Sequence, residues 1–171
     1  AFEQFVQKKL PNVKRYGLEG SESMAVLLDQ LIFEGSCAGM ADTVLGLSHR
    51  GRVTLMATMF GYSEAEVFHK LRGGSEFPNG SPHTGDFIVD LTKPAVVTFP
   101  ETDIPMNIDI VHNACHLESG SPVALGKSRT KDVNIAKACR SDRYTIGDHV
   151  LAISIHGDSV SARKLAMAII L

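Results

Sequence analysis

The sequence predicts an α/β fold with a mainly parallel sheet flanked by helices. Strand-like apolar runs occupy residues 43–47, 106–112 and 149–156, and the stretches between them are long enough to hold helices of ten or more residues. Strands separated in this way form layered α/β domains. The length of 171 residues predicts one domain that is large enough to bury an ordinary core.

The first half of the chain predicts three helices around the first strand. Phe2, Phe5 and Val6 lie at the spacing of a short amphipathic helix that Pro11 stops. A second helix is expected to begin near Ser21 and to run to Gly35. The buried strand 43–47 follows. Helices are then predicted over 53–60 and, behind a capping box formed by Ser63 and Glu66, as far as Leu71.

The second half alternates loops and strands. Residues 73–82 are rich in turn formers and predict a long loop. Residues 106–112 alternate apolar and polar, as in a strand with one covered face, whereas 149–156 predicts a strongly apolar strand. The basic segment 128–143 is interpreted as a solvated connection. An apolar segment, compatible with a helix, closes the chain.

Composition excludes several classes of protein. Hydrophobic residues make up 44% and charged residues 21%, which excludes a disordered tail, and a net charge of −2 gives no electrostatic footprint for nucleic acid or an anionic membrane. Three scattered cysteines favour a reducing compartment. The longest apolar run, 165–171, is too short to span a bilayer, and neither a signal peptide nor an initiator Met is visible.

Polar signatures follow each predicted central strand. The sequence Ser48-His49-Arg50-Gly51-Arg52 follows the first, 113–118 follows the second, and Gly157-Asp158 follows the third. In open parallel sheets ligands bind beyond the carboxyl ends of the strands. We therefore expect these segments to line one shared site.

Each signature has a functional and a plain interpretation. Arg50 and Arg52 at a helix start favour phosphate binding, but they also suit a solvated helix start. The cluster His112, Cys115, His116 and Glu118 allows a zinc site, proton transfer by a strand-end histidine, or no chemistry at all. Asp158 suits Mg²⁺ bridged to phosphate, and equally a helix N-cap. Cys115 has no evident activating base, and neither a P-loop nor a dinucleotide fingerprint is present.

Five ordered segments of the chain resemble a known family. They are FEQFVQKKLPNVKRYGLEGSES, LSHRGR, HKLRGGSEFPNG, NACHLESGSPVALGKSRTK and HVLAISIHGD. Their order is similar to that in the thiamine-diphosphate-dependent first component of 2-oxoglutarate dehydrogenase complexes, and RGGSEFP and VALGKSRTK are most similar to its 2-oxoadipate branch. The resemblance covers about residues 1–158 and implies part of a transketolase-like, diphosphate-binding domain.

The resemblance also implies a chemistry and a set of partners. Thiamine diphosphate with Mg²⁺ serves the oxidative decarboxylation of a 2-oxo acid, either 2-oxoglutarate or 2-oxoadipate. The succinyl or glutaryl group passes to lipoamide on a lipoyl-bearing acyltransferase component. The full-length proteins are homodimers and, in eukaryotes, mitochondrial, so a mitochondrial location is implied without a presequence in this chain.

By position, the resemblance gives roles to four residues. Asp158 matches the aspartate that holds Mg²⁺ on the diphosphate, and Arg50 matches an arginine on the cofactor. His49 and His116 match active-site histidines that contact the substrate or its intermediate.

The chain also departs from the family pattern. Leu47-Ser48 replace a usual Met-Pro, and Ala114-Cys115 replace a Pro-Ser before His116. Residues 159–171 do not continue the family sequence, so the downstream Mg²⁺-binding asparagine and the activating glutamate are not matched. We therefore expect a single, incomplete diphosphate-binding domain over 1–171, with 129–147 as a solvated connection and 159–171 as an atypical tail.

Three hypotheses follow. In the first, the chain is a truncated dehydrogenase component with weak or no turnover alone but with Mg²⁺-dependent affinity for thiamine diphosphate. In the second, it is a non-catalytic module or remnant that docks on the full-length component. The third is a metal-dependent hydrolase built on His112, Cys115 and His116.

Overall fold

A computed structural model of the chain describes residues 2–13, 16–75, 77–83, 91–112, 117–139, 145, 147–156 and 166–170. Its elements, in chain order, are α1 (Phe2–Lys9), α2 (Ser23–Cys37), β1 (Asp42–Leu47), α3 (Arg52–Thr58), α4 (Glu64–Leu71), β2 (Ala95–Val97), β3 (Met106–Ile110), α5 (Leu117–Cys139), β4 (Val150–His156) and β5 (Ala166–Ile170).

The strands form one five-stranded sheet in the order β2-β3-β1-β4-β5. The central strand β1 is parallel to both of its neighbours, and Asp42 pairs with Asn107 on β3 and with Val150 on β4. The outer strands β2 and β5 run antiparallel to β3 and β4. The predicted α/β fold with a mainly parallel sheet is confirmed, whereas both antiparallel edge strands differ from the sequence-based expectation.

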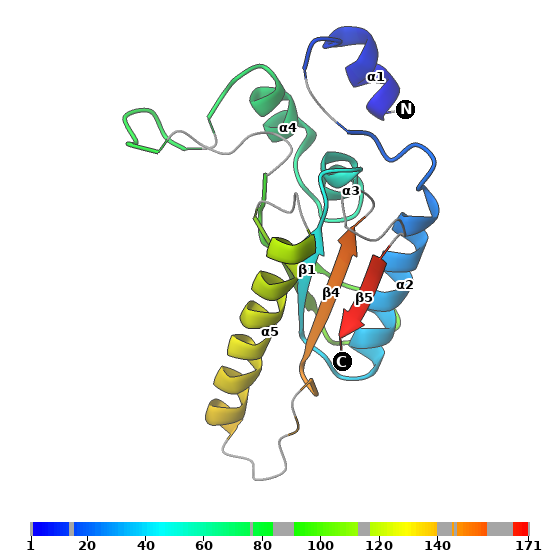
Figure 1. Cartoon of the computed structure of the whole chain (residues 1–171), viewed down its shortest axis with the longest axis vertical. Helices are drawn as coiled ribbons and strands as arrows, with labels where there is room; N and C mark the ends of the chain where they lie inside the picture. Colours follow the sequence, from blue (N-terminus) through cyan, green and yellow to red (C-terminus); the bar gives the residue numbers. More distant parts are fainter. Residues whose placement is uncertain are drawn as a thin grey trace.

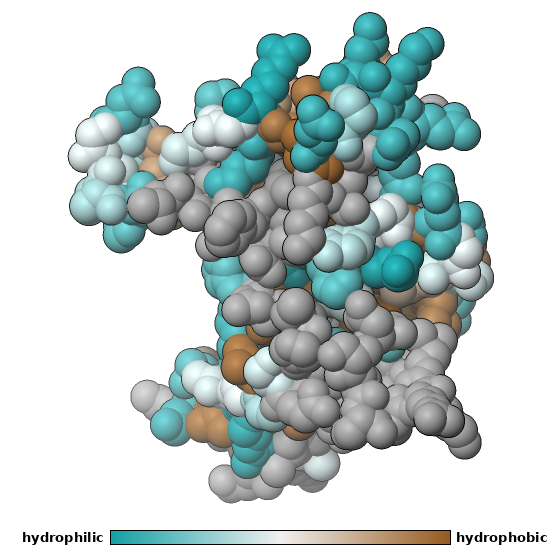
Figure 2. Space-filling model, turned by 45° about the horizontal axis from the view of Figure 1, so that its top comes forward, coloured by the Kyte–Doolittle hydropathy of each residue, from teal (hydrophilic) through white to brown (hydrophobic). Residues whose placement is uncertain are grey.

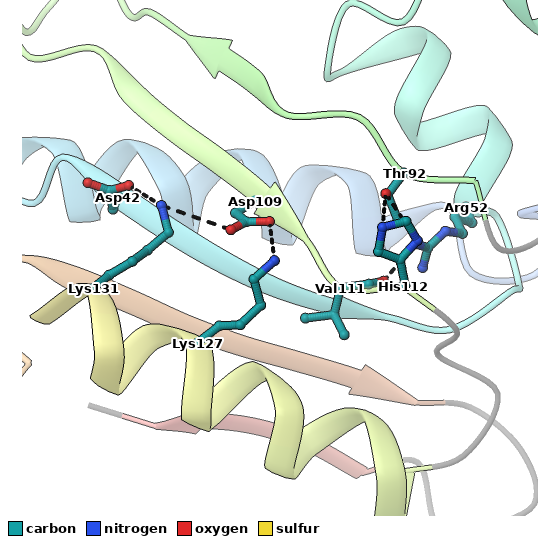
Figure 3. Close-up of polar contacts among 8 residues, drawn as sticks. All are labelled: Asp42, Arg52, Thr92, Asp109, Val111, His112, Lys127 and Lys131. Carbon is teal, nitrogen blue, oxygen red and sulfur yellow. Dashed lines mark hydrogen bonds and ion pairs between the residues drawn. The ribbon is translucent and has the colours of Figure 1, made fainter. Parts of the chain in front are cut away.

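Helices cover both faces of the sheet. Helix α5 lies across one face and α2 lies behind the other (Figures 1 and 3). Since side chains of a strand point alternately to opposite faces, Leu45 and Leu47 pack into the larger core, whereas Val44 packs toward α5. The larger core joins the sheet to α2, α3 and α4, through side chains that include Leu28, Ile32, Leu55, Met56, Val67 and Leu71. The central strands are therefore buried on both faces, as parallel strands usually are.

The predicted solvated connection is instead, as far as Cys139, the second half of α5. Lys127 donates to Asp109 and Lys131 donates to Asp42, each over 2.7 Å between Nζ and a carboxylate oxygen (Figure 3). Lysines four residues apart lie on one side of a helix, so both reach acidic side chains on the covered sheet face. Lys131 of this segment, together with Lys127 just before it, thus binds the helix to the sheet.

Two smaller details of the helix starts differ from expectation. Helix α2 begins at Ser23 rather than at Ser21, and it continues through Gly35 to Cys37. Ser63 is the N-cap of α4, but its hydroxyl makes no cap hydrogen bond. The Glu66 carboxylate is stabilised by the backbone N–H of Ser63, so only half of the predicted capping box forms.

The surface is mixed in character. In Figure 2 the residues coloured by hydropathy are mostly hydrophilic, with small apolar patches among them. In the described part of the chain, large apolar side chains with an exposed fraction above a third are Phe5, Val26, Leu27, Phe77, Val96 and Val123. Among the described residues, no helix combines the length and the apolar character needed to cross a membrane.

Candidate active site

Three parallel strands bring their carboxyl ends to one edge of the sheet. Because β3, β1 and β4 run in the same direction, the last residues of all three strands lie at that edge (Figure 1). His49 and Arg50 follow β1, and His112 follows β3. Of the four residues predicted to form the site, His49 and Arg50 are described, whereas His116 and Asp158 lie outside the described residues.

A tight turn presents His49 and Arg50. The amide of Ser48 still donates to the carbonyl of Ile155 on β4 at 3.2 Å, and Gly51 then takes φ +70° as the N-cap of α3. A Cβ at Gly51 would lie 2.4 Å from the Cδ1 atom of Leu18. Only glycine combines this left-handed backbone with so close an approach. The turn leaves Arg50 exposed and His49 half-buried.

An aromatic residue from another segment lies against His49. The ring centroids of Tyr16 and His49 are 4.2 Å apart and their planes are inclined by 47°. The carbonyl of Tyr16 also accepts the amide hydrogen of Gly51 at 3.0 Å. Sequence reasoning did not identify Tyr16 as a site residue, because its only local signal is an aromatic side chain before a glycine in a turn-rich segment.

Helix α1 anchors the segment that carries Tyr16. The Glu3 carboxylate accepts the amide hydrogen of Leu18 at 2.7 Å and a hydrogen bond from the Thr54 hydroxyl of α3. One side chain therefore links α1, the segment after Tyr16, and α3. The position of Tyr16 beside His49 thus depends on α1, a helix that comes well before β1 in the sequence.

Arg52 does not act as a phosphate donor, in contrast to the expectation for this motif. Its side chain is fully buried and donates to three backbone carbonyls: Nε to Leu91 at 2.9 Å, Nη1 to Leu47 at 2.7 Å and Nη2 to Val111 at 2.7 Å. Figure 3 shows Arg52 beside Val111. The guanidinium is already engaged by the protein. The exposed side chain of Arg50 makes no hydrogen bond or ion pair with any other described residue, so of the two arginines it is the one open to an anion.

The segment Leu91-Thr92-Lys93 closes one side of this region. The carbonyl of Leu91 accepts from Arg52, and the Thr92 hydroxyl is 3.0 Å from the Nε2 atom of His112. Lys93 forms an ion pair with Glu66 of α4, with 2.9 Å between Nζ and Oε2. This hydrogen bond with Lys93 lowers the pKa of Glu66 below its ordinary range. Three consecutive residues therefore tie the segment to α3, to the end of β3 and to α4.

Of the four residues that allowed a zinc site, the structure describes the side chain of His112 alone. Cys115 and His116 lie outside the described residues, and nothing is described of the Glu118 side chain. Among the residues that are described, no three His, Cys, Asp or Glu side chains gather as metal ligands.

Comparison with known proteins identifies relatives over nearly the whole chain, although no family model matches. A probable 2-oxoadipate dehydrogenase complex component E1 homolog from Dictyostelium discoideum is 35% identical over 161 residues, or 94% of this chain. The 2-oxoadipate dehydrogenase complex component E1 of Homo sapiens is 34% identical over 160 residues, and the 2-oxoglutarate dehydrogenase E1 component of Brucella ovis is 32% identical over 169.

This chain is a homologue of one segment of the 2-oxoadipate and 2-oxoglutarate dehydrogenase E1 components. It spans 17% of the length of these relatives. The described fold is consistent with the partial transketolase-like, diphosphate-binding domain that the sequence of this chain predicts. The turn at Gly51 presents His49 and Arg50 at the carboxyl end of β1.

Proposed function

We propose that this chain supplies part of the thiamine-diphosphate site of a 2-oxo acid dehydrogenase E1 component. The observation that supports the proposal best is the similarity to E1 components over 94% of the chain. The parallel strands add to it, because β1, β3 and β4 end at one edge of the sheet, where His49 and Arg50 follow β1. Ligands of parallel α/β sheets bind at such an edge.

The residues present suit a diphosphate cofactor. Arg50 is exposed beside the turn, and its guanidinium can donate to two phosphate oxygens at once. In this proposal Asp158 holds Mg²⁺, which neutralises the two phosphates. Thiamine diphosphate, when bound, supplies the carbon nucleophile and the electron sink for decarboxylation.

The protein side chains bind and orient in this mechanism. His49 is placed against Tyr16, which restricts the orientation of its imidazole. In the proposal His49 and His116 bind the substrate carboxylate and stabilise negative charge that develops during decarboxylation. An imidazole suits both tasks, because its pKa lies near neutrality and it can donate or accept a proton.

The substrate and the partners belong to the same proposal. The names of the relatives favour 2-oxoadipate or 2-oxoglutarate as substrate and assembly within a multienzyme complex. We infer a lipoyl-bearing acyltransferase component as the acyl acceptor, a homodimer as the working form and, for a eukaryotic source, a mitochondrial location.

Calorimetry with thiamine diphosphate, with and without Mg²⁺, tests the proposal. We expect heat of binding only when Mg²⁺ is present. Because a charge-assisted hydrogen bond contributes about 1.5–3 kcal/mol, Arg50→Gln should weaken binding at least about tenfold. Arg72→Gln is the matched control: Arg72 is also exposed, but it lies at the end of α4, and its loss should leave the affinity unchanged.

Asp158→Asn tests the metal role separately. With this variant, addition of Mg²⁺ should no longer produce binding of thiamine diphosphate. Asp148→Asn, in the turn before β4, should leave the Mg²⁺-dependent binding unchanged. Absence of binding at millimolar cofactor with Mg²⁺ contradicts the proposal. If the chain is instead retained on immobilised full-length E1 component without any cofactor affinity, the docking hypothesis is favoured.

A further inference from the structure

We propose that Arg52 is a positioning residue that holds the ends of β1 and β3 in a fixed relation, and thereby aligns the residues that follow them, His49 and His112. The effect of Arg52 on cofactor binding rests on the proposed function, whereas its link between the two strand ends does not. The side chain has an exposed fraction of 0%, and the two terminal nitrogens of its guanidinium donate to Leu47 and Val111.

The two acceptors lie at informative positions in the chain. Leu47 is the last residue of β1, two residues before His49, and Val111 follows β3 directly. Both carbonyls bond to adjacent nitrogens of a planar group, so the distance between them is set by the guanidinium. A third bond, from Nε to Leu91, fixes the segment whose next residue, Thr92, contacts His112.

General physical chemistry does not favour a cation at this place. Arg52 is the first residue of α3, where the helix dipole is positive and repels a cation. Removing a guanidinium from water also costs free energy, which only well-aligned partners offset. Three hydrogen bonds of 2.7–2.9 Å to separate parts of the backbone supply such partners. The arrangement is therefore suited to fixing geometry rather than to adding stability.

Lysine cannot reproduce this arrangement. Its ammonium is a single point of donation, whereas the arginine fork presents its donors in fixed directions. Arg52→Lys therefore keeps the charge and much of the side-chain length but loses the link between the strand ends. Arg72→Lys makes the same exchange at an exposed position and serves as the matched control.

Amide hydrogen exchange of the full chain tests the proposal. The amides of Ser48 and Val111 report on the two strand ends, because they donate to Ile155 and Leu45. The amide of Asn107, which donates to Ala41 at the other end of β3, reports on the rest of the sheet. We expect Arg52→Lys to accelerate exchange at Ser48 and Val111 at least tenfold more than at Asn107. We expect no change with Arg72→Lys.

A purely structural role gives a different pattern. If Arg52→Lys accelerates all three amides by the same factor, or leaves Ser48 and Val111 unchanged, the proposal is overturned. Should Arg52→Lys fail to fold, the unsubstituted chain still decides. The Nε–H of Arg52 must exchange at least a hundredfold more slowly than that of exposed Arg50, and equal rates overturn the proposal.

Cofactor binding separates this inference from the proposed function. With Mg²⁺ present, Arg52→Lys should weaken thiamine diphosphate binding at least fivefold although Arg50 is intact. If the unsubstituted chain binds no cofactor, the proposed function fails and the exchange pattern still decides the role of Arg52. If the cofactor binds equally well to both proteins, the proposed function stands and the positioning role fails.

Discussion

At the scale of single residues, the turn after β1 depends on Gly51. Its φ of +70° is unfavourable for a residue with a side chain, and a Cβ would collide with Leu18. Gly51→Ala should therefore lower the free energy of unfolding by about 2–5 kcal/mol, the sum of about 1–2 kcal/mol of backbone strain and about 1–3 kcal/mol of overpacking. Urea denaturation followed by circular dichroism measures this loss.

Gly61 separates the two contributions. Its φ is +63°, but a Cβ there meets no atom within 4 Å. Gly61→Ala should lower the free energy of unfolding by only about 1–2 kcal/mol. Equal losses for the two variants contradict the role given to the contact between Gly51 and Leu18.

The two arginines of the His49–Arg52 motif show what the sequence cannot reveal. Both are the same residue type beside one glycine, yet Arg50 is exposed and Arg52 is buried. The difference arises from acceptors distant in the sequence, since the Leu91 and Val111 carbonyls lie 39 and 59 residues further along. Local pattern predicted that the motif follows a strand at the sheet edge, but only tertiary structure shows which guanidinium is available to a ligand.

At the scale of elements, α5 is held to the sheet by its lysines as well as by apolar contacts. Lys131 donates to Asp42, and its Nζ atom lies 3.9 Å from a carboxylate oxygen of Asp109. Each of the three side chains is exposed by about a third or less. Lys131→Met should lower the free energy of unfolding by about 1 kcal/mol, near the upper end for pairs with some solvent access. Arg129→Met removes an exposed charge from the same helix and should change it by less than about 0.5 kcal/mol.

Salt gives an independent check on the Lys131 pair. At 1 M NaCl the Debye length falls to about 3 Å, so the difference between Lys131→Met and the unsubstituted chain should shrink. A difference that is the same at low and high salt indicates that packing of the lysine stem, rather than its charge, accounts for the loss.

The link between α4 and Lys93 should depend on pH. The Lys93 hydrogen bond lowers the pKa of Glu66, so its contribution to stability is present above the unfolded-state pKa and is lost as pH falls through the lower, folded-state value. Glu66→Gln should therefore be less stable than the unsubstituted chain at pH 7, by at most about 1 kcal/mol because the pair is exposed. Thermal melts should show that this difference shrinks as the pH falls below the ordinary glutamate value of 4.5 and disappears once Glu66 is protonated. A difference that does not shrink as the pH is lowered contradicts the ion-pair explanation.

The elements predicted correctly and incorrectly differ in the signal they carry. Strands β1, β3 and β4 were predicted because their apolar runs are buried on at least one face. Strand β2 has three residues, too few for a pattern, and the apolar segment that forms β5 is ambiguous between helix and strand at that length. The second half of α5 was missed because Lys131 lies on the side of the helix that faces Asp42 of the sheet, so that side does not show a continuous apolar stripe.

At the scale of the whole molecule, the sheet has one long apolar strand near its edge. All seven residues of β4 are buried, and β5 pairs with β4 from Ala152↔Ile170 to His156↔Ala166. Without β5, the backbone N–H and C=O groups on that side of β4 lack their partners. An unpaired strand of this length and composition is a template for pairing with another chain.

Removing residues 159–171 should therefore turn a folded chain into a self-associating one. We expect light scattering to rise with concentration and the thermal midpoint to fall by at least about 3 °C, since about 1 kcal/mol corresponds to roughly 2–4 °C at this size. Replacing 159–171 with a Gly-Ser sequence of equal length is the control, because it keeps the chain length but not the strand. If the Gly-Ser variant stays monomeric with an unchanged midpoint, β5 does not protect β4, and the sheet must end stably at β4 itself.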